Sequence, residues 1–299
     1  MDLNNHTNHD INFSKTGIFI IGHGSQDQEA IKQFWELVDI IKNEILSSED
    51  KNIKQLKVQG GFIEFAKPNL DEGLDSLVDQ NIQTIIAIPL VLLGAGHLKD
   101  DGPVALAKAR LRHPNVTFKY ANAIGIHHLI LDAFAKKIES SFESANDGTG
   151  ALIVSRGSTD PDANSDLYKV ARLLIERPDT PNLIEPAFVS LAEPEVQTGL
   201  DKLKSLGVNK IIAVPYFLFT GVLLNRIYKQ CNDWSQNNAI PVSITTELGC
   251  DRSIIEVIFE RFKEALLDSA HMNCDMCIYR WPIAGFESKV GTLNTDLLA

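Results

Sequence analysis

The sequence predicts an α/β protein with two similar lobes, each a parallel β-sheet flanked by helices. Short apolar runs alternate with amphipathic segments along the whole chain, and strands alternating with helices are typical of parallel sheets. A series of motifs also occurs twice, in the same order. The 299 residues, of which 44% are hydrophobic, are enough for two domain cores.

The apolar runs of the first half define its elements in order. Strands are expected at residues 17–21, 56–63, 84–92 and 116–120, and helices at 31–45, after Pro68, at 104–111 and at 128–142. Each expected strand is therefore followed by a helix that can cross over a face of the sheet.

The second half repeats this pattern. Residues 18–25 match 151–158, residues 61–68 match 187–194, and residues 85–89 match 211–215. A polar, glycine-containing stretch at 144–150 has the composition of a linker between the copies. The predicted organisation is a disordered polar tail at 1–14, an N-terminal lobe at 15–145, a degenerate C-terminal lobe at 151–270 and a tail at 271–299.

The two copies differ in three polar side chains. His23, Glu64 and His97 of the first copy correspond to Arg156, Ser190 and Leu223 of the second. All three follow predicted strands, and the carboxyl ends of parallel strands form the edge where ligands bind. Because all three polar side chains are missing from the second copy, they favour a chemical role that is performed once per chain. The alternative is that the three positions changed independently. Two imidazoles and a carboxylate suit a divalent ion such as Co²⁺, Fe²⁺, Ni²⁺ or Zn²⁺.

The segments around these residues resemble the sirohydrochlorin chelatases, the class II tetrapyrrole chelatases of the CbiX and SirB type. The resemblance rests on residues 20–25, 61–68 and 88–101 and extends from about residue 16 to 290. It implies a long form in which two lobes face each other across a cleft. It also implies insertion of Co²⁺, Fe²⁺ or sometimes Ni²⁺ into sirohydrochlorin without ATP.

The resemblance assigns roles to particular residues. It implies that His23 and His97 bind the metal and that Glu64 is the family's glutamate. The loop that would contact the tetrapyrrole consists of Leu92, Leu93, Gly94, Ala95 and Gly96. Either His23 or Glu64 has a suitable side chain to accept a pyrrole proton. We favour His23 as the acceptor and Glu64 as the residue that orients the site and relays protons.

Sirohydrochlorin carries many carboxylates, whereas the chain has a net charge of −11. Local cations must therefore offset the repulsion. We expect Arg156 to pair with a substrate carboxylate, because it occupies the position of His23 in the other lobe. Lys67, Lys99 and Arg226 are weaker candidates, since surface cations are commonly just solvated.

Cys274 and Cys277 form a Cys-x-x-Cys pair within a Met-x-Cys-x-x-Cys element. The resemblance implies an iron–sulfur cluster there, as in other long forms. Two thiolates are too few for a cluster, so Cys231, Cys250, His271 or a second chain would have to complete the ligand set. The alternative is a pair of ordinary cytoplasmic thiols.

Composition narrows the function further. The negative charge argues against nucleic acid as a partner, and no apolar run approaches the roughly 18 residues of a membrane span. The N-terminus lacks the apolar core of a secretion signal, so a cytoplasmic location is expected. The sequence leaves open whether the protein is a monomer or a homodimer.

The predicted activity is cobalt insertion in cobalamin biosynthesis, because the long, cysteine-bearing form resembles the cobalt enzymes. Iron insertion in sirohaem synthesis is the first alternative, and a non-catalytic metal or tetrapyrrole carrier is the second. A hydrolase is a weaker rival, because the chain has no Gly-x-Ser-x-Gly elbow. Ser25 is instead expected to cap a helix.

Overall fold

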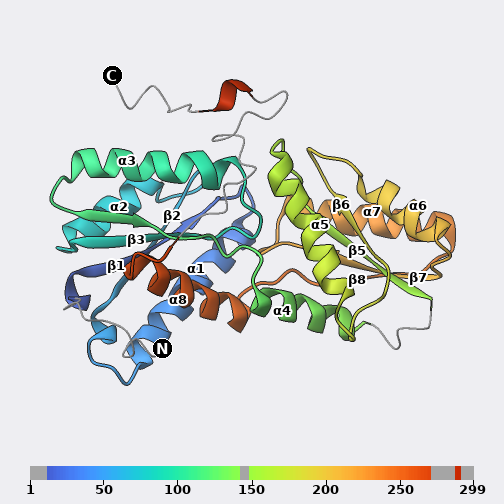
Figure 1. Cartoon of the computed structure of the whole chain (residues 1–299), viewed down its shortest axis with the longest axis horizontal. Helices are drawn as coiled ribbons and strands as arrows, with labels where there is room; N and C mark the ends of the chain where they lie inside the picture. The colour runs from blue at the N-terminus through green and yellow to red at the C-terminus, as the bar shows by residue number, and fades with distance from the viewer. Residues whose placement is uncertain (1–11, 142–147, 271–286, 291–299) are drawn as a thin grey trace. The chain divides into compact units, whose positions relative to one another are not determined.

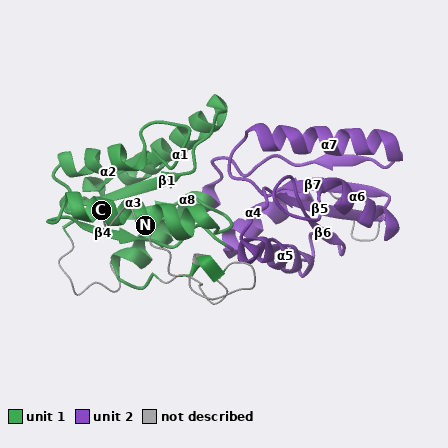
Figure 2. Ribbon diagram, turned by 90° about the horizontal axis from the view of Figure 1, so that it is seen from above, with its two compact units in different colours: residues 1–125, 254–299 green, residues 126–253 purple. Residues whose placement is uncertain are grey.

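The computed structural model describes residues 12–141, 148–270 and 287–290. Its contacts divide the chain into two compact units, shown in different colours in Figure 2. Unit 1 comprises residues 1–125 and 254–299, and unit 2 comprises residues 126–253. Each unit is built on one four-stranded parallel sheet, as the sequence predicts.

The sheet of unit 1 has the strand order β2-β1-β3-β4. Its strands are β1 (Thr16–Gly22), β2 (Lys57–Phe62), β3 (Thr84–Pro89) and β4 (Thr117–Tyr120). All seven residues of β1 are buried, because this strand lies inside the sheet with helices over both faces. The chain leaves β1 towards β2 on one side and returns to β3 on the other. The carboxyl ends of β1 and β3 therefore form the switch point at which open α/β sheets bind ligands.

Helices cover both faces of this sheet (Figure 1). They are α1 (Gln28–Ser47), α2 (Leu70–Asp79), α3 (Gly102–Arg112) and α8 (Arg252–Leu266). Leucines and alanines of α2 and α3 pack with Phe19 and Ile21 on one face, and α1 and α8 lie on the other. The start of α2 is fixed by a capping box in which Asn69 and Glu72 bond to each other's backbone N–H groups.

Unit 2 repeats this design with the strand order β6-β5-β7-β8. The strands are β5 (Thr149–Ser155), β6 (Ile184–Phe188), β7 (Lys210–Pro215) and β8 (Val242–Ile244). The helices are α4 (His128–Glu139), α5 (Pro161–Ile175), α6 (Val196–Ser205) and α7 (Val222–Asn238). Side chains of α6 and α7 form one core with Leu152 and Val154, and α4 packs against α5 and β7.

The last helix of each copy belongs to the unit of the other copy. Helix α4 follows β4 along the chain but lies in unit 2, whereas α8 follows β8 but lies in unit 1. The predicted lobes at 15–145 and 151–270 thus describe the repeats along the sequence, and the compact units exchange their final helices. Such an exchange is physically possible because equivalent sheets offer equivalent apolar faces to an amphipathic helix.

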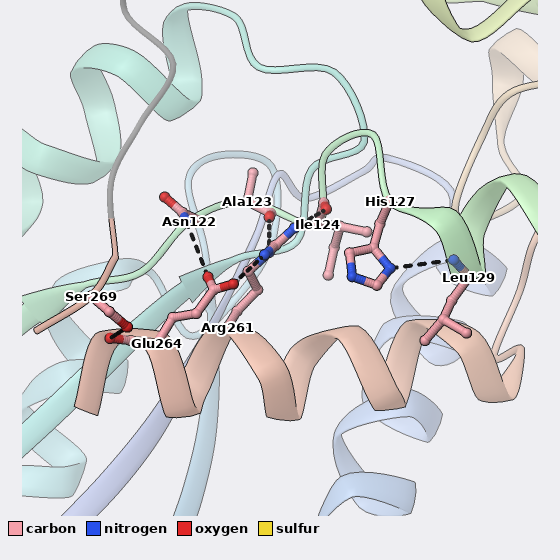
Figure 3. Close-up of polar contacts among 8 residues, drawn as sticks. All are labelled: Asn122, Ala123, Ile124, His127, Leu129, Arg261, Glu264 and Ser269. Atoms are coloured by element: carbon pink, nitrogen blue, oxygen red, sulfur yellow. Dashed lines mark hydrogen bonds and ion pairs between the residues drawn. The ribbon is translucent and has the colours of Figure 1, made fainter. Parts of the chain in front are cut away.

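Arg261 fixes α8 to the segment that follows β4 (Figure 3). Its Nε donates to the Ala123 carbonyl at 2.8 Å and its Nη2 to the Ile124 carbonyl at 3.2 Å. Its Nη1 also pairs with Glu264 at 2.7 Å, and Glu264 accepts a hydrogen bond from Asn122. The Arg261 side chain is only 13% exposed, so these bonds are partly shielded from water. The exchanged helix is therefore held by directional bonds as well as by apolar packing.

Two expected boundaries shift in the structure. Asn12 caps a short 3₁₀ turn at Phe13–Lys15, so the end of the predicted polar tail has regular structure. Strand β3 ends at Pro89 rather than near residue 92, because the Val91 N–H donates to the Pro89 carbonyl and turns the chain away. Within the described part of the chain, no helix is long and apolar enough to cross a membrane.

Candidate metal centre

The turn after β1 places His23 beside the turn after β2, which carries Glu64. The Glu64 N–H donates to the His23 carbonyl at 3.0 Å, which joins the two turns. Gly24 lies between them with φ +93°, and a Cβ at this position would come 1.7 Å from the Glu64 carbonyl oxygen. Only glycine fits both this close approach and this backbone conformation. The glycine therefore allows the two side chains to lie together.

His97 starts a π-helical turn, His97–Asp101, that precedes α3. The Gly102 N–H donates to the His97 carbonyl and closes the turn. Tyr120, at the end of β4, supports it by donating its hydroxyl to the Leu98 carbonyl at 2.9 Å. Burial raises the pKa of the Tyr120 hydroxyl, and the nearby Asp101 carboxylate raises it further, so Tyr120 remains a donor. Single π turns of this kind occur frequently at functional sites.

The structure brings His23, Glu64 and His97 together, as the sequence predicts. Nε2 of His23 lies 3.3 Å from Oε1 of Glu64, and the two imidazole centroids are 4.5 Å apart with perpendicular planes. One ligand atom from each residue lies within 4.8 Å of the other two. Because bonds from zinc-like ions to N and O are about 2.0–2.2 Å, a single ion can bridge such atoms after small side-chain movements. The side chains are 34–38% exposed, so a ligand can reach them.

Hydrogen bonds at Nδ1 orient both imidazoles. Nδ1 of His23 lies 2.9 Å from the Gly24 carbonyl oxygen, which can only accept, so this nitrogen carries the proton in the neutral ring. Nδ1 of His97 lies 2.7 Å from Oδ2 of Asp101, with the same consequence. The lone pair of each neutral ring is therefore on Nε2, the atom needed as a metal ligand.

The triad has an apolar border. Phe65 follows Glu64 with φ +63°, an unusual backbone conformation for an aromatic residue, and its ring is 6.2 Å from that of His23. The residue is 58% exposed. In the predicted tetrapyrrole loop, Leu92 is buried, whereas Leu93, Gly94, Ala95 and Gly96 are half-buried. An exposed aromatic ring beside these candidate metal ligands would suit a flat, partly apolar ligand.

Unit 2 keeps the backbone of this site without its ligands. The Ser190 N–H donates to the Arg156 carbonyl at 3.0 Å, and Gly157 has φ +83°. Arg156 is exposed in the place of His23, and Leu223 packs against the core in the place of His97. Within the described residues, unit 2 contains no comparable group of histidine, cysteine and carboxylate side chains.

Several predictions about single residues need correction or refinement. Ser25 is not the helix cap: its hydroxyl accepts from the Asp27 N–H, and Asp27 caps α1 by accepting from Glu29. Lys67 is exposed and pairs with Glu72 at 2.5 Å, whereas Lys99 is buried and is therefore not a surface cation.

Two of the other histidines, His113 and His127, have structural contacts. His113 pairs through Nε2 with Asp75 at 2.7 Å, and this contact joins the end of α3 to α2. His127 caps α4 by accepting a hydrogen bond from the Leu129 N–H (Figure 3). Neither contact involves the triad.

Cys231 does not suit the role of cluster ligand. Its side chain is completely buried in the apolar core of unit 2, and burial raises the pKa of its thiol to about 12. A thiol with such a pKa resists the deprotonation that metal ligation requires. Cys274, Cys277 and His271 lie outside the described residues, so the predicted cluster stays a prediction.

The sequence interpretation missed the contact of Asp101 with His97. The spacing held a signal, because residues four apart in a helical turn lie on the same side. Phe65 was also missed as a neighbour of the site, although it directly follows Glu64 in one of the repeated motifs.

The family model of CbiX matches residues 17–141 and 150–265. The chain belongs to the CbiX family. The two matched ranges are the two copies recognised in the sequence, and the resemblance predicted from the motifs is confirmed.

Known relatives of this CbiX protein include enzymes named for different metals. It is 33% identical over 267 residues to the sirohydrochlorin cobaltochelatase of Priestia megaterium, covering 88% of this chain and 84% of the relative. It is 26% identical over 264 residues to the sirohydrochlorin ferrochelatase of the same organism, covering 88% and 94%. Among solved structures, the cobalt complex of the sirohydrochlorin chelatase SirB from Bacillus subtilis subspecies spizizenii has a TM-score of 0.70 at 25% identity. The match covers 85% of this chain and 96% of that one.

Proposed function

We propose that this protein is a sirohydrochlorin chelatase that inserts Co²⁺ into its substrate without ATP. The observation that carries the proposal is the convergence of His23, Glu64 and His97 at the switch point of the first sheet. The cobaltochelatase relative supports cobalt as the metal, whereas the relatives named for iron make Fe²⁺ the alternative.

In the proposed reaction, the metal ion and sirohydrochlorin are both substrates. Nε2 of His23 and Nε2 of His97 bind the ion and leave coordination positions open towards the macrocycle. As the pyrrole nitrogens replace the imidazoles, two N–H protons must leave. The released His23 imidazole accepts a pyrrole proton. Glu64, 3.3 Å away and 38% exposed, orients the protonated ring, accepts that proton and releases it to solvent. The imidazole is then neutral again and accepts the second pyrrole proton by the same route.

Substrate recognition is assigned to groups around this centre. Phe65 offers an exposed ring beside His23, and the half-buried loop at 93–96 lies directly before His97 in the chain. Arg156 is exposed at the corresponding edge of unit 2 and is assigned to a peripheral carboxylate of the macrocycle. A guanidinium suits this role because it presents paired N–H donors to a carboxylate.

Replacement of His23 tests the proposal directly. We expect His23→Ala to abolish insertion at neutral pH, because the variant loses a metal ligand and the proton acceptor together. The assay follows the absorption bands of sirohydrochlorin under anaerobic conditions with Co²⁺, Fe²⁺ or Ni²⁺. His128→Ala is the matched control, since it removes an exposed imidazole from the start of α4.

The outcomes of this assay separate the alternatives. Near-normal turnover of His23→Ala would refute the assignment of the site. A single stoichiometric spectral change in the unmodified protein would indicate a carrier, and faster turnover with Fe²⁺ would indicate a ferrochelatase. The proposed reaction transfers no electrons, so it does not require the cluster predicted at Cys274 and Cys277.

A further inference from the structure

The carboxylate of Asp101 contacts the second imidazole of the triad without belonging to the triad itself. Its Oδ2 is 2.7 Å from Nδ1 of His97, on the side of the ring opposite Nε2. The distance is that of a charge-assisted hydrogen bond. The Asp101 side chain is about half exposed, so the fold does not require a carboxylate there for burial or packing.

The local backbone is built to make this contact. His97 and Asp101 are the first and last residues of the π-helical turn, and the Gly102 N–H bonds back to the His97 carbonyl. The Tyr120 hydroxyl holds the middle of the turn through the Leu98 carbonyl. A Cβ at Gly102 would lie 2.2 Å from the Tyr120 hydroxyl oxygen, so the close approach of the turn to β4 also depends on glycine.

Unit 2 lacks both the turn and the acid. The match of residues 85–89 to 211–215 places Leu223 at the position of His97 and Ile227 at that of Asp101. Ile227 is fully buried in the core of unit 2. Helix α7 begins there with an ordinary helical bond from the Asn225 N–H to the Gly221 carbonyl. The copy without the histidine is therefore also the copy without the carboxylate that would orient it.

We propose that Asp101 is a positioning residue for metal capture. By accepting the Nδ1 proton of His97, it holds the ring in one orientation and keeps the lone pair on Nε2. The negative charge also makes Nε2 a stronger donor to the metal. This inference rests on the proposed metal site and adds to it a residue that acts only through His97.

The test measures Co²⁺ binding separately from insertion. Titration of the full-length protein with Co²⁺ alone, followed by the visible bands of the bound ion, gives the affinity. We expect Asp101→Ala to weaken Co²⁺ binding about 10- to 100-fold, the usual effect of losing such a partner. In the insertion assay, the KM for Co²⁺ should rise and the KM for sirohydrochlorin should stay the same. A general structural defect would not divide the two KM values in this way.

Three further variants keep the test decisive. Asp101→Asn has the same shape and retains a neutral acceptor, so it should fall between the wild type and Asp101→Ala. Asp100→Ala removes the neighbouring carboxylate of the same turn and should leave Co²⁺ affinity within two-fold. In a His97→Ala background, Asp101→Ala should cause no further loss, because its effect passes through the imidazole.

Specific results would overturn the inference. The inference fails if Asp101→Ala binds Co²⁺ as tightly as the wild type. If the alanine variant does not fold, the same criterion applies to Asp101→Asn. The inference also fails if Asp100→Ala is equally damaging or if the loss persists in the His97→Ala background. The proposed function fails separately, if the wild-type protein binds Co²⁺ but does not insert it into sirohydrochlorin. In that case the role of Asp101 can still be tested by Co²⁺ affinity.

Discussion

The ends of β1 and β2 in unit 1 and of β5 and β6 in unit 2 share one backbone design. Gly24 and Gly157 have φ values of +93° and +83°, and each glycine faces a carbonyl oxygen of the neighbouring turn. The next serine, Ser25 or Ser158, accepts a hydrogen bond from the residue that caps the following helix. We call each pair of joined turns, at 22–25 with 63–66 and at 155–158 with 189–192, the frame. The fold keeps the frame in both units, whether or not it carries a histidine and a glutamate.

The segment that carries His97 in unit 1 differs from its counterpart at Leu223 in unit 2, both in backbone and in side chains. Unit 1 enters α3 through the π-helical turn that presents His97, whereas unit 2 enters α7 as an ordinary helix with Leu223 against the core. The comparison teaches that the convergence of His23, Glu64 and His97 at this sheet edge involves two separate features. One is the pair of joined turns, which both copies have, and the other is the remodelled helix start, which only the first copy has among the described residues.

The glycine pair gives the sharpest test of this comparison. We expect Gly24→Ala and Gly157→Ala each to destabilise the protein by at least about 1–3 kcal/mol, because both impose left-handed strain on alanine. The clash with the neighbouring carbonyl adds to this cost. Gly24→Ala should also slow metal insertion on the order of 100-fold, since it displaces Glu64 from His23. Urea unfolding and the spectral assay measure the two effects.

Gly157→Ala is the matched control, because it should lower the stability of the protein by a similar amount at a position that carries none of the proposed metal ligands. Equal losses of Co²⁺ affinity in both variants would show that the metal centre responds to general stability. The division of roles between the units would then be wrong.

The sequence was sufficient for the strands and for the convergence of His23, Glu64 and His97. Alternating apolar runs predict the sheet, and residues that follow adjacent parallel strands must emerge at one edge. The duplication supplied the comparison that singled out these three positions.

The exchanged helices and the π turn could not be predicted from the sequence. The apolar stripe of α4 shows that the helix packs on a sheet, but the two sheets are equivalent and the stripe does not choose between them. Likewise, two adjacent acids follow His97 at a short distance, and only the local path of the chain decides that Asp101 bonds to Nδ1. Both features depend on tertiary contacts, such as those of Arg261 and Tyr120, that leave no periodic signal.

Transfer of the ligands into unit 2 tests whether the side chains alone are sufficient. The triple variant Arg156→His, Ser190→Glu, Leu223→His places the three ligand types on the second frame. We expect a second Co²⁺ to bind about 10- to 100-fold more weakly than the first, because the new imidazole at 223 lacks a carboxylate partner and a π turn. Isothermal titration with Co²⁺ gives the number of sites and both affinities.

Two results for the triple variant would contradict this expectation. If the second site binds as tightly as the first, the π turn and Asp101 are dispensable. If the double variant without the Leu223→His change binds Co²⁺ as well as the triple variant, the third position contributes nothing.

The smallest expected effect concerns Arg156, the residue that stands where unit 1 has His23. An exposed guanidinium–carboxylate pair contributes about 0.2–1 kcal/mol, so Arg156→Ala should raise the KM for sirohydrochlorin roughly two- to five-fold. Co²⁺ affinity should not change, because the residue contacts only the tetrapyrrole in the proposed complex. Arg156→Lys should recover part of the loss, since it restores the charge but not the paired donors. The control is Arg172→Ala, which removes an exposed arginine paired with Glu176 on α5. An unchanged KM in Arg156→Ala would show that unit 2 lost its histidine without gaining a substrate contact, and the second frame would then serve the fold alone.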